Sequence, residues 1–480
     1  MPIGYVGPNG QWVSGVNPAG SALVPVRLDP TTGALVGPSA SWSLALAGAL
    51  NTIALLGDSI TDRNAPAPSG GYSVYGSDGY FSVANALMGW QFEVLGTSGS
   101  SGQDSGFILG RLPLDILSIS PKPRYCFVLA GTNDEASGLS VAQTRANLTQ
   151  IYTTLQSNGI TPIIATLPPR NDAGWTLARK RRDVQRNRWI REFTRVNDVI
   201  CCDFYRVLVN SAAAGTAGWT LVSDSIGAIS DTSVDQIHPN NFGSFMMALE
   251  IVRRLGGLLN LQTRGGLPAI TDNMYTVASG PIAEGNIVPN GSFTGTAGTK
   301  GAIATGSLAD EWSRQGDSAP AGGGTIVLSK VLKSDSFGYW QQIAIAGGTA
   351  GDNQGSYQIR SDQDYPSVFS QVGPTTWQVG DTVWGQVAFE TDAAGWAGAA
   401  ADTNCNMAMR VQFLSATGSI TETGWGLNAA GSSKHRMPSG VLRTRTVVVP
   451  PGTTAIYMWI YVVGRGTWRF ADAEIRKQIT

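Results

Sequence analysis

Three short polar segments in the first half of the sequence carry side chains that could support nucleophilic catalysis. The first, Gly57–Ile60 (Gly-Asp-Ser-Ile), directly follows the apolar run Ile53–Leu56. A serine at the junction of a strand and the next helix exposes its hydroxyl group and places its backbone N–H at the helix start. Ser59 is therefore a candidate nucleophile, although a Gly-Asp-Ser turn on its own is more often a helix cap.

The other two segments place further polar side chains next to predicted elements. Gly131–Asp134 (Gly-Thr-Asn-Asp) follows the apolar run Tyr125–Ala130, and Asp235–Pro239 (Asp-Gln-Ile-His-Pro) precedes a helical pattern. His238 is one of only two histidines, and Asp235 stands three residues before it, so a turn could bring the carboxylate to the imidazole. Taken singly, a capped turn and a surface histidine remain open interpretations.

The pattern around these segments predicts an α/β domain over residues 47–262. Short apolar runs alternate with amphipathic helices, which is typical of a parallel sheet covered by helices on both faces. The expected strands are Thr52–Leu56, Phe92–Leu95, Tyr125–Ala130, Pro162–Thr166 and Val199–Phe204, and the expected helices are Gly79–Met88, Val141–Ser157, Leu177–Val196 and Phe242–Leu259. Sites in such sheets form at the carboxyl ends of strands, so the three segments are expected to converge.

The rest of the chain has a different organisation. Residues 1–46 are rich in Gly, Pro and Ser and are expected to form an N-terminal arm or small β element, and residues 263–285 are expected to form a linker. Residues 286–480 predict an all-β sandwich or jelly roll. Its expected strands are Thr325–Leu332, Gly338–Ile345, Thr382–Glu390, Met407–Leu414, Arg443–Val449, Ala455–Val463 and Thr467–Ile475.

Composition excludes several classes of function. The 480 residues carry a formal net charge of −1 and only 14 % charged residues, which argues against binding to nucleic acid or to an anionic membrane. Two histidines, and four cysteines without a C-x-x-C pair, give no basis for a histidine-rich zinc site or a disulfide framework. The N-terminus has neither a basic region nor an apolar core, so we expect no secretory signal, and no apolar run is long enough to span a bilayer.

The ordered segments resemble the SGNH (GDSL-type) hydrolase family, which is named for its serine, glycine, asparagine and histidine blocks. The remaining block is a glycine after the second strand, and the family often has an Arg-Leu pair about nine residues beyond it. Arg111-Leu112 lies nine residues after Gly102, so Gly102 matches this block better than Gly99. The resemblance covers about residues 47–262.

The resemblance implies a serine esterase with a catalytic triad. Ser59 attacks the ester carbonyl, His238 takes up the proton and later returns it, and Asp235 orients the imidazole. The N–H groups of Ser59 and Gly102, together with the side-chain amide of Asn133, receive the oxyanion. The resemblance implies neither a metal nor an organic cofactor.

Further features depart from the family or lie outside its blocks. Ile60 replaces the leucine that is usual in the first block, and Thr97 stands where many members have asparagine. The Gly- and Ser-rich stretch Ala65–Gly79 after the nucleophile is expected to shape the rim of the site. The basic run Arg179–Arg195 holds eight Lys and Arg residues and is either a solvated helix face or a surface for acidic polysaccharide or a neighbouring subunit.

The C-terminal region suggests a glycan as the binding partner. The segments 286–293 and 468–475 are similar to the first and last strands of jelly-roll carbohydrate-binding modules, and Trp396 and Trp425, in Gly-rich loops, are candidate substrate-binding residues that could stack on sugars. The N-terminal arm, the missing signal and the appended sandwich are similar in style to phage tail and receptor-binding proteins. That analogy implies a virion or extracellular location and a homotrimer; otherwise we expect a cytoplasmic protein.

Hydrolysis of O-acetyl esters on a polysaccharide is the function that these observations favour. The alternative from another class is a glycan-binding virion or adhesion protein whose hydrolase site is vestigial. A lipase or thioesterase of the same family is a third interpretation, which the absence of an obvious amphipathic lid disfavours.

Overall fold

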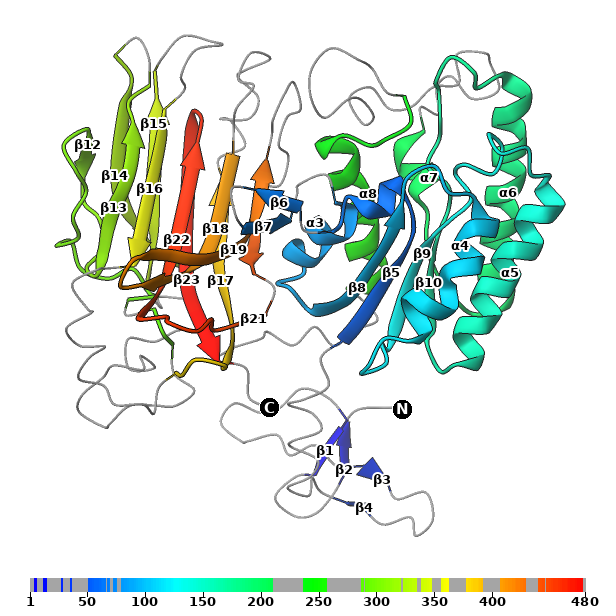
Figure 1. Cartoon of the computed structure of the whole chain (residues 1–480), viewed down its shortest axis with the longest axis horizontal. Coiled ribbons are helices and arrows are strands. Elements are labelled where there is room, and N and C mark those ends of the chain that lie inside the picture. The colour runs from blue at the N-terminus through cyan, green and yellow to red at the C-terminus, as the bar shows by residue number, and fades with distance from the viewer. Residues whose placement is uncertain are drawn as a thin grey trace. The chain divides into compact units, whose positions relative to one another are not determined.

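The structure is a computed structural model of the whole chain (Figure 1). It describes residues 4–6, 12–14, 27–28, 35–36, 51–65, 67–69, 72–75, 79–209, 236–256, 286–288, 290–320, 323–334, 338–347, 355–361, 377–391, 406–428, 439–444 and 446–477. The chain divides into two compact units, residues 1–52 and 53–480. The first unit contains two antiparallel hairpins, β1 (Gly4–Val6) with β2 (Trp12–Ser14) and β3 (Arg27–Leu28) with β4 (Leu35–Val36).

A five-stranded sheet forms the centre of the α/β part of the second unit. Its strand order is β11-β10-β9-β5-β8, and the pairings β5–β9, β9–β10 and β10–β11 are parallel. The strands are β5 (Asn51–Asp58), β8 (Phe92–Ser100), β9 (Tyr125–Leu129), β10 (Thr161–Ala165) and β11 (Ile200–Cys202). The strand order reverses between β5 and β9, and ligands bind such sheets beyond the carboxyl ends at that point.

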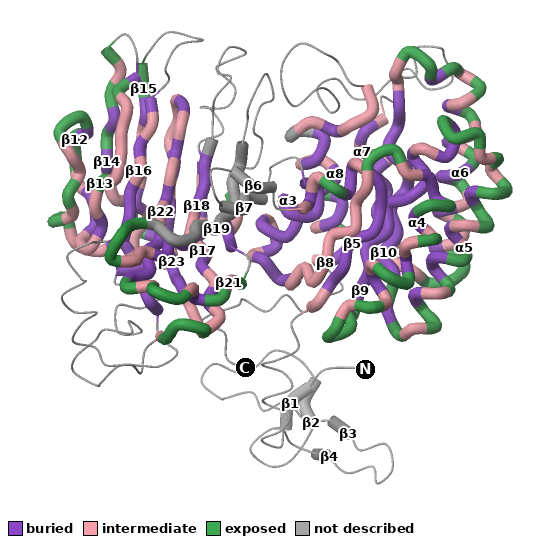
Figure 2. Tube along the Cα trace, in the orientation of Figure 1, coloured by how far each residue is buried: buried purple, intermediate pink, exposed green. Residues whose placement is uncertain are grey.

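Helices cover both faces of this sheet (Figure 1). They are α2 (Ser59–Asp62), α3 (Tyr80–Leu87), α4 (Ser105–Leu112), the π-helical turn η1 (Pro113–Leu117), α5 (Val141–Ser157), α6 (Leu177–Val196), α7 (Phe204–Leu208) and α8 (Asn241–Leu255). In β5, Leu55 packs in the cluster that contains α3 and α8, whereas Leu56 packs with α4, α5 and α6. Alternate strand residues are thus buried on opposite faces, and β5, β9 and β10 are buried along most of their lengths (Figure 2). Burial on both faces explains the uninterrupted apolar runs and confirms the predicted α/β class.

The C-terminal region consists of two seven-stranded sheets whose pairings are mostly antiparallel. One has the order β12-β14-β15-β23-β17-β20 with β21 on β17, and the other has the order β13-β16-β22-β18-β19-β7-β6. Their strands are β12 (Ala304–Gly306), β13 (Trp312–Ser318), β14 (Thr325–Leu332), β15 (Tyr339–Ala346), β16 (Ser356–Ser361), β17 (Thr382–Thr391), β18 (Asn406–Ser415), β19 (Gly418–Asn428), β20 (Ser439–Arg443), β21 (Val447–Val448), β22 (Ala455–Val463) and β23 (Gly466–Lys477). The predicted all-β character of this region is confirmed.

One hairpin of the α/β part extends a C-terminal sheet. β6 (Ala67–Ser69) pairs with β7 (Tyr72–Tyr75), and β7 runs parallel to β19. The sequence predicts that Ala65–Gly79 shapes the rim of the site, and the structure places the strands β6 and β7 within this stretch. Their partner strand lies far along the chain, so the local residue pattern does not reveal the pairing.

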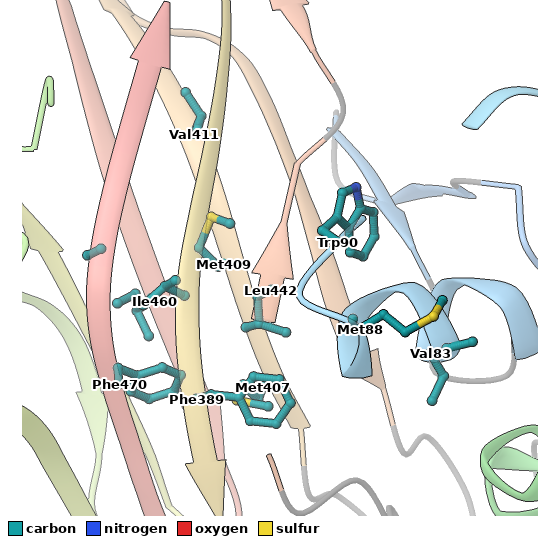
Figure 3. Close-up of a cluster of buried hydrophobic side chains, with 14 of the residues drawn as sticks. Val83, Met88, Trp90, Phe389, Met407, Met409, Val411, Leu442, Ile460 and Phe470 are labelled. Atoms are coloured by element: carbon teal, nitrogen blue, oxygen red, sulfur yellow. The ribbon is translucent and has the colours of Figure 1, made fainter. Parts of the chain in front are cut away.

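A continuous apolar core also joins the two parts of the second unit (Figure 3). Met88 and Trp90, at and after the end of α3, belong to the same buried cluster as Leu442 of β20. The backbones approach closely at Gly440, where a Cβ atom would lie 3.1 Å from the carbonyl oxygen of Ala86. The C-terminal region therefore packs directly against α3.

Predicted and observed elements differ mainly in the polar segments. α5 and α6 have the predicted bounds, whereas α4 and the strands β13, β16 and β19 were not expected from the sequence. The expected linker, residues 263–285, lies outside the described residues. Within the part of the chain that the structure describes, no helix is long and apolar enough to cross a membrane.

Candidate active site

Ser59 lies at the junction between β5 and α2, at the carboxyl edge of the sheet. Asp58 is the N-cap of α2, and its side chain accepts a hydrogen bond of 3.0 Å from the Ile60 N–H. Gly57 is required before it, because a Cβ atom there would lie 2.1 Å from the Thr61 hydroxyl oxygen and 2.4 Å from the Leu129 carbonyl oxygen. The tight contact between β5 and β9 thus fixes the backbone that presents Ser59.

His238 lies in the turn before α8 and reaches the serine. Its Nε2 is 2.7 Å from the Ser59 Oγ, within a half-buried setting. The side chain of Asn240 caps α8 by accepting a bond of 3.0 Å from the Gly243 N–H. The separation between the hydroxyl and the imidazole suits direct proton transfer from serine to histidine.

Gly102 and Asn133 are brought together on the neighbouring loops. Gly102 lies between β8 and α4 with φ +74°, a conformation that favours glycine. Asn133 follows β9, and its Nδ2 donates a bond of 3.1 Å to the Gln103 carbonyl oxygen. An amide nitrogen carries two hydrogens, so this bond orients the group and the second hydrogen can serve a substrate oxygen.

Asp134 ties these loops to each other. Its two carboxylate oxygens accept bonds of 2.7 Å from the Ser105 N–H and 2.6 Å from the Ser105 hydroxyl. Burial raises the pKa of Asp134, while its hydrogen bonds with Ser105 oppose that shift. The carboxylate therefore joins the end of β9 to the start of α4, a larger role than capping its own turn.

Arg111 connects the strands beneath the same loops. It donates to the carbonyl oxygens of Ser98, at 3.0 Å, and of Gly57, and it pairs with Asp115 at 3.0 Å. Gly57 precedes Ser59 by two residues, and Ser98 lies in β8 just before the turn that contains Gly102. Arg111 thus links the chain segments that carry Ser59 and Gly102.

Comparison with known proteins identifies a family that part of this chain resembles. Residues 55–244 match the GDSL-like lipase/acylhydrolase family. The matched segment is about two-fifths of the chain and contains all five residues of the expected triad and oxyanion hole. The match supports a GDSL-like lipase/acylhydrolase domain within residues 55–244. None of the curated proteins is similar enough to this chain to count as a match.

Several solved structures are similar to part of this chain. A lipase/acylhydrolase from Enterococcus faecalis is 22% identical, covers 44% of this chain and 98% of its own, and has a TM-score of 0.34. A mutant acetyl-xylooligosaccharide esterase from Geobacillus is 17% identical, covers 43% of this chain and 94% of its own, and also has a TM-score of 0.34. A putative acylhydrolase from Bacteroides fragilis is 19% identical, covers 45% of this chain and 90% of its own, again with a TM-score of 0.34.

Some expected site residues lie beyond what the structure describes. Asp235 and Trp396 are outside the described residues. Trp425 lies in β19, so the expected Gly-rich loop at this position is wrong, and the orientation of its side chain is not described. The structure therefore brings Ser59 to His238 and places Gly102 near Asn133, while the orienting acid and the sugar-stacking residues stay predictions.

The candidate nucleophile Ser59 stands next to a buried acid, Asp58. Asp58 is completely buried, and burial raises its pKa to about 6, against the lowering effect of the hydrogen bond from the Ile60 N–H. A carboxyl group with such a pKa is largely protonated, and therefore uncharged, at mildly acid pH. Its hydrogen bond from the Ile60 N–H ties it to the backbone of α2, which indicates a role in holding the turn that carries Ser59.

Part of the basic run of α6 forms an internal network, whereas Arg181, Arg188 and Arg195 are exposed, as expected of a solvated helix face. Arg186 is fully buried and its Nη1 lies 3.0 Å from a carboxylate oxygen of Glu135, which also pairs with Arg182. Arg191 pairs with Asp203 at 2.8 Å. Glu135 directly follows the Asn-Asp segment, so α6 anchors the loop that carries Asn133. The sequence signal for this network was Glu135, directly after Asn133-Asp134, together with the Arg-rich run Arg179–Arg195.

Asn133→Ala is expected to lower kcat by about 10²–10³-fold with little change in KM, because it removes one oxyanion donor. Steady-state kinetics on an acetate ester measure both constants. Asn197→Ala is the matched control, since Asn197 caps the far end of α6 through the Phe193 carbonyl oxygen. A kcat for Asn133→Ala equal to that of the control would remove this residue from the site.

Proposed function

We propose that this protein is a serine esterase that hydrolyses acyl esters, with O-acetyl groups on a polysaccharide as the substrate class. The observation that carries the proposal is the 2.7 Å separation between the Ser59 Oγ and the His238 Nε2, at the sheet edge where ligands bind. The family match over residues 55–244 supports the same chemistry.

Acylation starts with transfer of the Ser59 proton to His238 as the serine oxygen attacks the ester carbonyl. The carbonyl oxygen gains negative charge, and the N–H groups of Ser59 and Gly102 and the amide of Asn133 are the proposed donors to it. His238 then gives its proton to the leaving alcohol, and an acyl-serine remains. Asp235 is proposed to hold the imidazole in the tautomer that this sequence of transfers needs.

Deacylation repeats the same steps with water. His238 takes a proton from the water, the hydroxide attacks the acyl-serine, and the proton returns to the Ser59 oxygen as the acid leaves. No step requires a metal or an organic cofactor. The two proton transfers make His238 essential in both halves of the reaction.

The choice of a glycan ester rests on the rest of the chain. The C-terminal sheets are attached to the α/β part through a shared core, and the sequence offers Trp396 and Trp425 as residues that could stack on sugars. A low charge content suits a neutral glycan better than a polyanion. A virion or extracellular location and a homotrimer belong to the same proposal.

A longer acyl group is the second candidate, favoured by exposed apolar side chains after the glycine turn. Phe107 of α4 is 67% exposed and Leu114 of η1 is 76% exposed. Both follow Gly102 in the chain, so exposed apolar side chains lie on the elements that come directly after the glycine proposed to hold the oxyanion.

The test measures the wild-type chain on p-nitrophenyl esters of increasing acyl length and on O-acetylated glycans, with acetate release as the second readout. We expect the highest kcat/KM with acetyl esters and release of acetate from at least one glycan. A fluorophosphonate should label Ser59, as peptide mass spectrometry would show. A preference for octanoate would favour the lipase, and an inert chain that binds glycan would favour the vestigial site.

A further inference from the structure

The turn that carries His238 is held from two sides by hydrogen bonds to its backbone. The carbonyl oxygen of Pro239 accepts a bond of 3.1 Å from the Nη1 of Arg63, and the carbonyl oxygen of Gln236 accepts one of 3.0 Å from the Asn171 N–H. The two acceptors flank His238 in the sequence. These bonds therefore fix the backbone from which the imidazole extends.

The backbone of Arg63 is fixed at the end of α2, the helix that begins at Ser59. It is the C-cap of α2, four residues after Ser59, and has helical φ and ψ angles. The next residue, Asn64, is buried and donates a bond of 2.9 Å to the Thr61 carbonyl oxygen, while its Oδ1 accepts one of 2.7 Å from the Phe81 N–H. The end of α2 is thereby fastened to the start of α3.

The second contact is anchored to the loop of Asn133. Asn171 follows Arg170, whose guanidinium lies 3.8 Å from the centre of the Trp175 ring and whose Nη1 donates a bond of 3.3 Å to the Thr132 carbonyl oxygen. Lys180 of α6 donates a bond of 2.5 Å to the Asn171 side chain. Of these two contacts, that of Arg63 uses a side-chain donor, so a substitution can remove it without altering the backbone of the donor.

We propose that Arg63 is a positioning residue for His238, an inference that rests on the proposed function. Its guanidinium ties the turn of the base to the helix of the nucleophile and so sets the separation between the Ser59 Oγ and the His238 Nε2. A hydrogen bond from a charged donor is stronger than a neutral one. Proton transfer depends steeply on distance, and a displacement of about 1 Å can cost about 10²-fold in rate.

Misplacement of His238 should matter most when the leaving group needs a proton. An alkoxide leaves only as it is protonated, so an alkyl acetate requires His238 as acid as well as base. p-Nitrophenolate is a stable anion and leaves without that proton. Loss of Arg63 should therefore reduce turnover of an alkyl acetate more than turnover of p-nitrophenyl acetate.

The experiment compares the full-length variants Arg63→Ala, Arg63→Gln and Arg63→Lys on both esters. We expect Arg63→Ala and Arg63→Gln to lower kcat on the alkyl acetate by about 10–100-fold, with KM changed less than about two-fold and a smaller loss on p-nitrophenyl acetate. Arg63→Lys should restore part of the lost kcat, because an ammonium group can also donate to the Pro239 carbonyl. Arg181→Ala, at an exposed arginine of α6, is the control for loss of one positive charge.

Two results would overturn the proposal. One is a kcat for Arg63→Gln that equals that of Arg181→Ala. The other is an equal loss on both esters, with no recovery in Arg63→Lys, which would show a merely structural role. In both cases the wild type is active and the proposed function stands; a wild type that hydrolyses neither ester would overturn both inferences.

Discussion

Ser59→Ala is expected to lower kcat on an acetate ester by roughly 10⁴–10⁶-fold, and His238→Ala is expected to do the same. The two groups act as one unit, because the 2.7 Å contact makes the hydroxyl a nucleophile only while the imidazole can take its proton. The double variant should therefore be no slower than either single variant. Steady-state kinetics, with acetate quantified independently, measure all three.

The control for these variants is Ser157→Ala at the end of α5, where the exposed hydroxyl donates to the Thr154 carbonyl oxygen of its own helix. It should keep the wild-type kcat and the wild-type circular dichroism spectrum. Losses that multiply in the double variant would mean that Ser59 and His238 act independently. A Ser59→Ala variant with wild-type activity would place the nucleophile elsewhere.

The α/β part could be predicted well because burial leaves a strong periodic signal. β5 and β9 are buried on both faces and appear in the sequence as uninterrupted apolar runs. α5 also carries a Ser140–Gln143 capping box, a local signal that marks its first turn. Three candidate site segments follow from these elements, because each lies next to a strand end or helix start.

The missed elements lack that local signal. β13 (Trp312–Ser318) is mostly polar and only partly buried, so its alternation is weak. β7 becomes a strand through its pairing with β19, a contact between segments distant in the sequence. The burial of Arg186 is equally invisible in the sequence, since a charged residue is normally expected at the surface.

The contact of Arg63 with Pro239 could not be predicted from the sequence either. Its type and position after the serine segment give no reason to pair it with Pro239, because the two residues meet only once β5 and α8 are assembled. Ser59 and His238 could be named from motifs. The groups that hold them require the three-dimensional arrangement.

Arg186→Met is expected to lower the free energy of unfolding by about 3–5 kcal/mol, the usual effect of breaking a buried ion pair. The arginine is fully buried and its guanidinium donates to Glu135 at 3.0 Å, to Asp183 at 3.2 Å, to the Thr144 hydroxyl at 3.1 Å and to the Leu139 carbonyl oxygen at 2.7 Å. Methionine fills similar space but satisfies none of these acceptors. Urea unfolding followed by tryptophan fluorescence measures the change.

The loss of unfolding free energy in Arg186→Met should also depend on pH, because Arg186 pairs with two acids, Glu135 and Asp183, that titrate. Hydrogen bonding to Arg182 lowers the pKa of Glu135, and Arg186 adds to this effect. The stabilisation from the ionised Glu135 is therefore present above the unfolded-state pKa of 4.5 and is lost as the pH falls through the folded-state value.

Burial raises the pKa of Asp183 to about 6 although Arg186 lowers it, so without the arginine the acid should stay protonated to higher pH. Arg186 therefore favours the ionised form of both acids. The Asp183 share of the gap between the variant and the wild type should shrink as the pH falls towards about 6, and the Glu135 share should shrink as the pH falls below 4.5. Arg181→Met should cost less than about 0.5 kcal/mol at every pH. A pH-independent gap would mean that Arg186 acts through packing and its bonds to Thr144 and Leu139 instead.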